Sequence, residues 1–304
     1  MLCLVLSCVL SLVFAGCGGD SEAPSVSPSG GAPASSGQTQ QIAMPQSGTS
    51  DVKENDVAKI DTSNADQGYA MVSCHTGENK KLKVQIKHGD TLYNYDLSDD
   101  GQEATFPFSC GNGTYAITVY QNLTGNKYAP LLSSSVDVQL ESEFAPYLLP
   151  NQFVDYTPES KAVAKGFALT ENAQSDLERV QEIFTYIITH VKYDNDKADA
   201  VQQGALTGYL PDVDDTLATN KGICFDYAAL LATMLRSHNI PAKLVTGYAQ
   251  PLGVYHAWNM IYITDVGWVS TYIYFDGTNW QLADPTFAAS GSTDGVSYQP
   301  VYEY

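Results

Sequence analysis

The amino-acid sequence predicts an α+β protein in which a β-rich half precedes a half that mixes helices and strands. Three observations predict this division. Between residues 69 and 140, short runs of alternating apolar and polar side chains are separated by turn sequences such as SDDGQE and GNGT. Between residues 177 and 191, apolar side chains recur at three- and four-residue steps, which indicates an amphipathic helix. After residue 242, strand-like runs return.

The amino-acid composition of the chain limits the kinds of molecule that it is expected to bind. The chain has 304 residues, which is enough for two ordinary domains, and 44% of them are hydrophobic, so most of the chain can bury a core. Fifteen basic residues against 34 acidic residues leave a net charge of -19. Such a surface repels phosphate backbones, so we expect no nucleic acid as a partner.

The first residues, MLCLVLSCVLSLVFAGC, form an apolar run that is too short and too close to the terminus for a membrane span. The run resembles a bacterial lipoprotein signal over residues 1–17, with FAGC as the lipobox and Cys17 as the lipidated residue. Residues 18–55 are rich in Gly, Ser, Pro and Gln and predict a flexible tether. We therefore expect an extracytoplasmic protein, lipid-anchored to the cell membrane. An ordinary secretion signal that is cleaved nearby is the alternative.

Residues 60–145 predict a β-sandwich domain. Six or seven short strands at regular spacing are typical of an immunoglobulin-like sandwich. Cys74 and Cys110 lie near two of these strands. Outside the cytoplasm they could form a disulfide that stabilises the fold by about 3–4 kcal/mol in the chain-entropy model. We expect this disulfide, and two free buried cysteines are the alternative.

Residues 146–304 predict a second domain that contains the candidate chemistry. A helix is expected to follow Cys224 and to end at Asn239, because Pro241 cannot continue it. The N-terminus of a helix stabilises a thiolate through its unpaired N–H groups and partial positive charge. Gly222 precedes this cysteine and permits a tight turn, and Asp226 can cap the first turn.

Two later stretches supply partners for a thiol nucleophile. YHAWNMIYI contains His256, and an imidazole can take the proton of the thiol. NWQLADPTF contains Asp284, and a carboxylate can fix the tautomer of that imidazole. None of the histidines has a metal-ligand spacing, so we expect no metal site and no cofactor.

The segments GICFDYAALLATMLRSHNIPAKLVTGY, HAWNMIYI and WQLADPTF together resemble the transglutaminase-like superfamily, which has a papain-like α+β fold. The resemblance covers roughly residues 160–290. It implies that Cys224 is the nucleophile, that His256 is the general base and acid, and that Asp284 orients His256. It further implies site-lining or packing roles for four residues: Gly222, Tyr193, Trp258 and Trp280. Tyr193 is a candidate donor of a second oxyanion hydrogen bond.

Residues 264–279, TDVGWVSTYIYFDGTN, stand where the family usually has a brief turn. Their apolar alternation is enough for an extra pair of strands, which either form a wall of the substrate site or extend the sheet. The insertion also contains Asp276, an alternative third member of the triad. The Asp-Pro pair after an apolar strand favours Asp284.

The sequence predicts a cell-envelope cysteine hydrolase of the peptidase or amidase type, which acts on a peptide or protein amide through a thioester. Two alternatives stay open, a protein-crosslinking transglutaminase and a non-catalytic binding or adhesion lipoprotein. Transfer to an amine needs a channel that excludes water. Because the core after residue 160 is short and the sequence ends at Tyr304, we expect hydrolysis to dominate.

Overall fold

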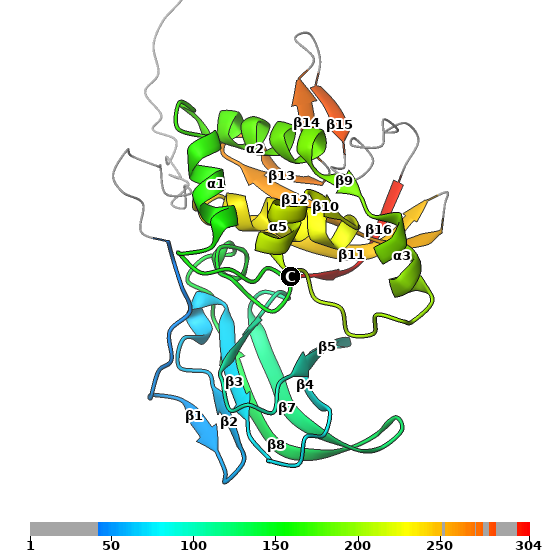
Figure 1. Ribbon diagram of the computed structural model, residues 1–304. Coiled ribbons are helices and arrows are strands. Elements are labelled where there is room, and N and C mark those ends of the chain that lie inside the picture. Colours follow the sequence, from blue (N-terminus) through cyan, green and yellow to red (C-terminus); the bar gives the residue numbers. More distant parts are fainter. Residues whose placement is uncertain (1–41, 251–252, 271, 276–279, 284–296) are drawn as a thin grey trace, which may run out of the picture. The chain divides into compact units, whose positions relative to one another are not determined.

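The computed structural model describes residues 42–250, 253–270, 272–275, 280–283 and 297–304, all within one compact unit (Figure 1). Cys17, Asp276 and Asp284 lie outside the described residues, as do the predicted signal and most of the predicted tether. In the part of the chain that is described, no helix has the length and apolar character needed to cross a membrane.

The β-rich half consists of two four-stranded antiparallel sheets, drawn from blue to blue-green in Figure 1. The first sheet has the order β1-β2-β3-β6, and the second has the order β5-β4-β7-β8. The strands of the first sheet are β1 (Val52–Glu54), β2 (Ala58–Asp61), β3 (Tyr69–Cys74) and β6 (Ala104–Pro107). Those of the second are β4 (Leu82–His88), β5 (Thr91–Leu97), β7 (Gly113–Thr124) and β8 (Lys127–Val138). A one-turn 3-10 helix, η1 (Ala65–Gln67), joins β2 to β3.

Alternation of side chains along the strands builds the core of this sandwich. On β4, Leu82, Val84 and Ile86 are buried while the residues between them are more exposed. Because successive side chains on a strand point to opposite faces, one apolar row per strand faces inward. Val72 of β3 and Phe106 of β6 belong to the same buried cluster, so both sheets contribute to one core.

The predicted Cys74–Cys110 disulfide is wrong, because both residues are free thiols. Strands β3 and β6 pair antiparallel, with Tyr69 opposite Pro107. Cys74 lies five residues from Tyr69 in one direction, about 16 Å along the strand. Cys110 follows Pro107 in the opposite direction, so the register keeps the two cysteines far beyond the roughly 7 Å between Cα atoms that a disulfide allows. Burial raises the pKa of Cys74 to about 11.

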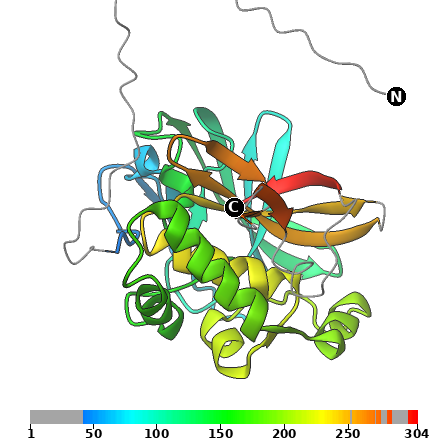
Figure 2. The same ribbon diagram turned by 90° about the horizontal axis from the view of Figure 1, so that it is seen from above.

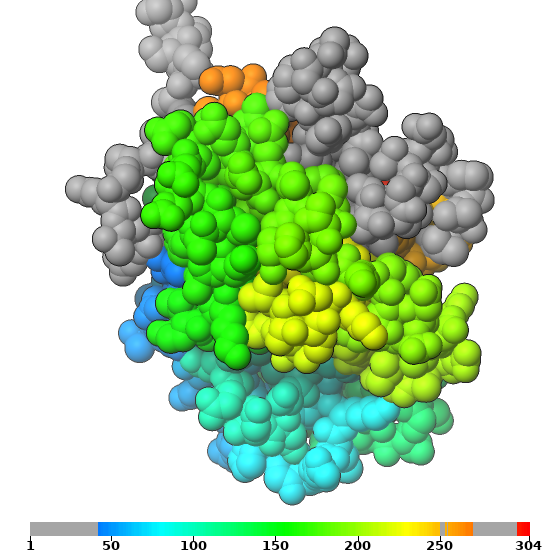
Figure 3. Space-filling model, turned by 45° about the horizontal axis from the view of Figure 1, so that its top comes forward, coloured from blue at the N-terminus to red at the C-terminus, as the bar shows by residue number. Residues whose placement is uncertain are grey.

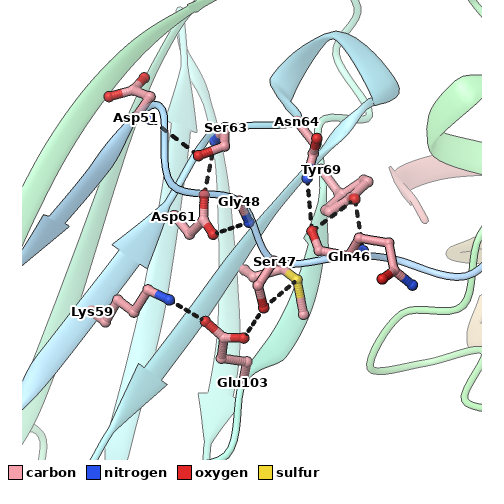
Figure 4. A network of polar contacts seen from close by, with 11 residues as sticks. Gln46, Ser47, Gly48, Asp51, Lys59, Asp61, Ser63, Asn64, Tyr69 and Glu103 are labelled. Carbon is pink, nitrogen blue, oxygen red and sulfur yellow. Dashed lines mark hydrogen bonds and ion pairs between the residues drawn. The ribbon is translucent and has the colours of Figure 1, made fainter.

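The predicted tether ends earlier than residue 55, because its last part lies on the sandwich (Figure 4). The main-chain N–H of Gln46 donates to the hydroxyl of Tyr69 at 2.9 Å. The main-chain N–H of Gly48 donates to the carboxylate of Asp61 at 2.7 Å, and β1 then pairs with β2. Hydrogen bonds hold the last part of the predicted tether against the sandwich. The amino-acid composition of this part does not show such contacts.

In the described residues of the mixed half, five helices lie beside a four-stranded sheet. The sheet has the order β13-β12-β11-β16, and helix α5 packs against β12, α1 and α2 (Figure 2). The helices are α1 (Lys161–Leu169), α2 (Asp176–His190), α3 (Asn195–Gln202), α4 (Val213–Thr219) and α5 (Cys224–Arg236). The sheet strands are β11 (Ala242–Gln250), β12 (Val254–Ile263), β13 (Gly267–Ser270) and β16 (Ser297–Glu303). Smaller elements are η2 (Ala145–Tyr147), β9 (Lys192–Tyr193), β10 (Lys221–Gly222), β14 (Tyr272–Phe275) and β15 (Trp280–Ala283).

The described part of the insertion at residues 264–279 contributes one strand to the four-stranded sheet, which agrees with one of the two sequence interpretations, and one strand to a separate two-stranded sheet. Its strand β13 pairs antiparallel with β12, and its strand β14 pairs with β15. The indole of Trp268 on β13 packs against Phe144 and Tyr147 of the connection between the two halves. Lys243 lies 4.5 Å above the same indole, so the insertion fastens the connection to the sheet.

An aromatic seam joins the two halves of the molecule. Tyr93 of β5 packs against Tyr302 with ring centroids 5.1 Å apart, and Tyr95 packs against Tyr304 at 5.9 Å. Phe153 of the connection contacts Tyr304 at 4.4 Å. Aromatic rings at these separations attract one another beyond their simple burial. The boundary predicted near residue 145 therefore separates two sequence patterns, whereas the hydrophobic core continues across it.

Candidate active site

Cys224 is the first residue of α5 and is partly exposed. Just before it, β10 pairs with β9, so that Gly222 lies beside Tyr193. A Cβ atom on Gly222 would lie 2.6 Å from the Cβ of Asp226, which no real side chain tolerates. Glycine is required here so that the first turn of the cysteine helix can fold back against the chain that enters it.

Asp226 caps this first turn and is fully buried. Its carboxylate accepts a hydrogen bond of 2.7 Å from the main-chain N–H of Ile223, as the sequence predicted for a capping role. The ammonium of Lys197 lies 3.2 Å from the same carboxylate, and the hydroxyl of Tyr209 donates to it. A buried carboxylate needs such partners, because an unpaired buried charge is costly.

The charges in this network favour an ionised pair. Burial by itself lowers the pKa of Lys197, but its hydrogen bond with Tyr209 and the charge of Asp226 raise it overall. Burial and the hydrogen bond to Asp226 raise the pKa of Tyr209 to about 12. Lys197 therefore stays positive at neutral pH and offsets a negative charge that would otherwise oppose a thiolate two residues away. The sequence predicted the capping role of Asp226 but not its contacts with Lys197 and Tyr209. A carboxylate within an apolar helix does indicate that hydrogen-bonding or charged partners exist.

His256 and Trp258 lie on β12, two residues apart, so both side chains face the same side of the sheet. Their rings are nearly parallel, with centroids 6.3 Å apart. Gly247 pairs with His256 from the neighbouring strand β11. A Cβ atom on Gly247 would lie 2.1 Å from the main-chain oxygen of Gln299 and 2.9 Å from the indole of Trp258, so this glycine makes room for both the neighbouring strand and the buried tryptophan.

Cys224 and His256 line the same cleft, which has a volume of about 370 Å³. The cleft is also lined by Phe153, Ile223, Phe225, Thr246, Tyr255 and Ala257. Three walls come from segments far apart in sequence: the first turn of α5, the sheet, and the loop between α3 and α4. The structure thus brings together two of the three predicted catalytic residues. The third, Asp284, directly follows β15 and lies outside the described residues.

Two of the predicted site-lining residues, Gly222 and Trp258, lie next to the cleft and do not line it. Trp258 is buried beside His256 and Gly222 lies beside the start of α5, and neither lines the cleft. Tyr193 is half-exposed, and its pKa is raised to about 12, first by burial and then by the proximity of Cys224 and Asp226. Its hydroxyl therefore keeps its proton at neutral pH. Trp280 lies on β15, whose side chains are not described.

The sandwich also contributes to this cleft, which the sequence did not predict. Asn94 and Asp96 of β5 line it together with Gln152 of the connection. The loop between α3 and α4 adds Leu206, Gly208, Tyr209 and Leu210. These residues come from segments that carry no catalytic pattern, so only the folded chain shows that they share a cleft with Cys224.

Comparison with known proteins agrees with this architecture. Residues 162–285 match the family model of the transglutaminase-like superfamily. Over 146 residues the chain is 30% identical to kyphoscoliosis peptidase of Mus musculus and 29% identical to that of Homo sapiens. Each alignment covers 45% of this chain and 19% of the relative, so the chain spans about a fifth of the length of these curated relatives. A candidate cysteine protease from Cytophaga hutchinsonii aligns over 84% of this chain and 81% of its own, with 16% identity and a TM-score of 0.36.

The chain therefore carries a transglutaminase-like domain at residues 162–285. This confirms the family resemblance predicted from the cysteine, histidine and aspartate segments. It also confirms an α+β protein with a transglutaminase-like core and a large β-sheet content.

Proposed function

We propose that this protein is a cysteine hydrolase that cleaves an amide bond of a peptide or protein through a thioester. One observation carries the proposal: Cys224 at the N-terminus of α5 and His256 on β12 line one cleft. A thiol at a helix start and an imidazole on a neighbouring sheet are the two groups that acyl transfer to sulfur requires. The matched relatives in mouse and human bear the name peptidase, which agrees with this chemistry.

The proposed reaction has two steps. The sulfur of Cys224 attacks the amide carbonyl carbon while its proton passes to His256. The carbon–nitrogen bond then breaks, the amine leaves with that proton, and the acyl group stays on sulfur as a thioester. In the second step, water gives a proton to His256 and attacks the thioester. Release of the carboxylic acid returns the proton to sulfur, so each turnover consumes one water and involves no redox change.

Two groups can stabilise the negative oxygen of the tetrahedral intermediate. The main-chain N–H of Cys224 lies in the first turn of α5, where helical N–H groups have no acceptor four residues earlier. Tyr193 keeps its phenolic proton at neutral pH, because its pKa is raised to about 12, and can supply the second hydrogen bond. In this proposal Asp284 orients His256.

The alternative is transfer of the acyl group to an amine, which crosslinks proteins. Several polar groups stand among the described residues that line the cleft, including Asn94, Gln152 and Thr246. Tyr255 at the same cleft is 55% exposed. These features let water reach the thioester, whereas a transferase excludes it. We therefore place hydrolysis first and crosslinking second, with a non-catalytic binding protein as the remaining alternative.

The products distinguish these reactions. A glutamine-containing peptide library is incubated with the protein, with and without a fluorescent primary amine, and the products are analysed by mass. We expect cleavage, or deamidation with a gain of about 1 Da, and we expect Cys224→Ala to abolish it. Amine incorporation that is faster than both would establish the transferase. If no Cys224-dependent product forms in any library, the binding protein becomes the better description.

We also propose that the protein is held at the outer face of the cell membrane by a lipid on Cys17. The sequence FAGC and the following polar segment support this location. Cells expressing the full chain are grown with an alkyne fatty acid. Label that disappears in Cys17→Ser supports the anchor, and a freely secreted, unlabelled protein contradicts it.

We further propose that the sandwich is of the immunoglobulin-like type. Its two sheets hold β1, β2, β3 and β6 on one side and β4, β5, β7 and β8 on the other. Tyr115, near the start of β7, donates a hydrogen bond of 2.8 Å from its hydroxyl to the main-chain oxygen of Gly111. This contact resembles the tyrosine corner of immunoglobulin-like domains. An experimental structure in which β5 paired with β6 instead of β4 would contradict this assignment.

A further inference from the structure

Strand β5 of the sandwich forms part of the cleft that contains Cys224. Asn94 and Asp96 of this strand line the cleft, and so does Gln152, whose side-chain amide donates to the main-chain oxygen of Asp96 at 2.5 Å. In the space-filling view, the cyan residues of the sandwich lie against the yellow-green residues of the α3–α4 segment (Figure 3). A substrate that reaches Cys224 therefore contacts the sandwich as well.

The aromatic seam holds β5 firmly in this position. Tyr93, Tyr95 and Leu97 are buried, whereas Asn94 and Asp96 are exposed between them. The buried tyrosines pack against Tyr302 and Tyr304 of the mixed half. The exposed row of β5 is thus a fixed wall, which is what a selective binding site requires.

Among the strands that the structure describes, none pairs with the outer edge of β5. This strand lies at the end of its sheet, in the order β5-β4-β7-β8. The main-chain oxygen of Asp96 points away from β4, since it accepts the hydrogen bond from Gln152. In an antiparallel strand, residues two apart direct their N–H and C=O groups to the same side. The main-chain groups of Asn94 are therefore directed to the free edge, where an extended peptide can pair with them.

The wall carries one half-exposed carboxylate among the described residues. Among the described residues that line the cleft, Asp96 is the carboxylate. It is half-exposed and 2.6 Å from Lys83, which does not line the cleft. Gly208 faces this carboxylate, because a Cβ atom there would lie 3.6 Å from it, and the glycine leaves that space open.

A second hollow of about 410 Å³ shares two lining residues, Gln152 and Leu210, with the cleft. Among the described residues, Glu103 and Asp155 are the carboxylic side chains that line this hollow. Glu103 is paired with Lys59 at 2.8 Å, and burial raises the pKa of Asp155. Asp96, which lines the cleft itself, is therefore the carboxylate that can attract a positive charge on a bound peptide.

We propose that β5 is a substrate-recognition element, in which the main chain of Asn94 pairs with an extended peptide and Asp96 selects a lysine or arginine side chain near the scissile amide. The proposal rests on the proposed hydrolase function and adds its substrate class. It identifies Asp96 as a specificity-determining residue supplied by the sandwich.

The test compares peptides that carry Lys, Met or Glu at each position in turn, using the full-length protein. We expect at least a tenfold preference in kcat/KM for Lys over Met at one position. Asp96→Asn is expected to reduce this preference at least fivefold, and Asp96→Lys is expected to favour Glu. Glu78→Gln is the matched control, because Glu78 is also an exposed sandwich carboxylate paired with a lysine, and it does not line the cleft. A preference that is equal in the wild type, Asp96→Asn and Glu78→Gln overturns the proposal.

The main-chain contact is tested with a second pair of variants. Asn94→Pro removes the N–H at the free edge, where proline is tolerated in strands. Glu54→Pro is the matched control, because Glu54 is exposed on β1, the edge strand of the other sheet, and does not line the cleft. We expect Asn94→Pro to lower kcat/KM at least tenfold for all peptides, with Glu54→Pro within twofold of the wild type and unchanged thermal unfolding in both. Equal activity of the two variants contradicts strand pairing.

A binding measurement separates failure of this proposal from failure of the hydrolase function. Fluorescence anisotropy of the same Lys and Met peptides is measured with Cys224→Ala, which cannot turn them over. Binding that favours Lys and depends on Asp96 supports the recognition element even if the wild type proves to have no hydrolase activity. Turnover by the wild type without any dependence on Asp96, in binding or in kcat/KM, rejects the recognition element and leaves the hydrolase intact.

Discussion

The two ends of helix α5 have opposite environments. At the N-terminal end, Cys224 is partly exposed in a cleft, and the first turn is capped by Asp226. At the C-terminal end, Arg236 and His238 are almost fully buried. Arg236 donates three hydrogen bonds of 2.6–2.9 Å to main-chain oxygens of Leu149, Ala242 and Tyr304.

This difference shows how the fold keeps a reactive group accessible without loosening the helix that carries it. A cation at the C-terminus and acceptors of N–H groups at the N-terminus both complement the helix dipole. The buried end fixes α5 against the sheet and the connection, so the open end needs few packing contacts of its own. We therefore expect substitutions at the open end to change chemistry and those at the buried end to change stability.

Removal of the Cys224 thiol should have the largest of the predicted effects. We expect it to change activity and not stability. Cys224→Ala is expected to lower kcat by roughly 10⁴- to 10⁶-fold, as loss of a nucleophile does in other hydrolases. Thermal unfolding should shift little, because the side chain is only partly buried. Cys74→Ala provides the control, since Cys74 is buried in the sandwich and should leave kcat unchanged. Equal activities of the two variants would remove Cys224 from the mechanism.

Loss of the buried guanidinium should have the largest effect on stability. Arg236→Met removes three hydrogen bonds to main-chain oxygens. The oxygen of Tyr304 keeps the N–H of Leu244 as a donor, whereas those of Leu149 and Ala242 lose the guanidinium, and each such loss costs about 1–3 kcal/mol. We expect the free energy of unfolding, measured in urea, to fall by about 3 kcal/mol or more. Arg179→Met, which breaks a partly exposed pair with Asp176, should cost no more than about 1 kcal/mol. Similar losses in both variants would contradict a special role for the buried end.

Loss of the positive charge of Lys197, which neutralises Asp226, should affect both the stability of the protein and the reactivity of Cys224. Lys197→Met leaves a buried carboxylate that keeps only its hydrogen bonds to Ile223 and Tyr209, and we expect a destabilisation of about 2–3 kcal/mol. The unbalanced charge should also slow iodoacetamide alkylation of Cys224 at neutral pH. The double variant Lys197→Met, Asp226→Asn should recover most of both losses. If the double variant is as impaired as the single one, charge balance is not the reason.

The smallest predicted effect is on the pH dependence of stability, to which His238 at the buried end of α5 contributes. His238 donates from Nδ1 to the main-chain oxygen of Met234, and its Nε2 lies 2.7 Å from the hydroxyl oxygen of Thr170. Burial lowers its pKa below 6.5, and the charge of Arg179 adds to this while that of Asp176 opposes it.

Because the unfolded chain takes up this proton at higher pH than the folded chain, the contribution to stability is complete above about pH 6.5 and is lost as the pH falls below it. The slope is at most about 1.4 kcal/mol per pH unit for one proton. Urea unfolding of His238→Gln should show a weaker pH dependence than the wild type below pH 6.5. His75→Gln, at an exposed position, should keep the wild-type dependence.

Local signals in the sequence determined the elements that carry the chemistry. The start of α5 at Cys224 follows from the glycine before it, and its end follows from Asn239, which adopts a positive φ of 62°, and from Pro241. The periodicity of apolar residues and the signals that cap a helix extend over a few neighbouring residues. They can therefore be recognised in the sequence without knowledge of the tertiary structure. The order of the cysteine, histidine and aspartate segments predicted the transglutaminase-like domain for the same reason.

Only the tertiary structure decided which distant groups meet. Arg236 binds an oxygen 87 residues earlier in the chain, and Asp96 shares a cleft with a cysteine that lies in the other half of the molecule. The antiparallel register of β3 and β6 separated two cysteines that the sequence alone would have paired. Such contacts depend on strand order, register and which strand lies at a sheet edge. Those properties arise from packing of the whole chain, and no local pattern in the sequence records them.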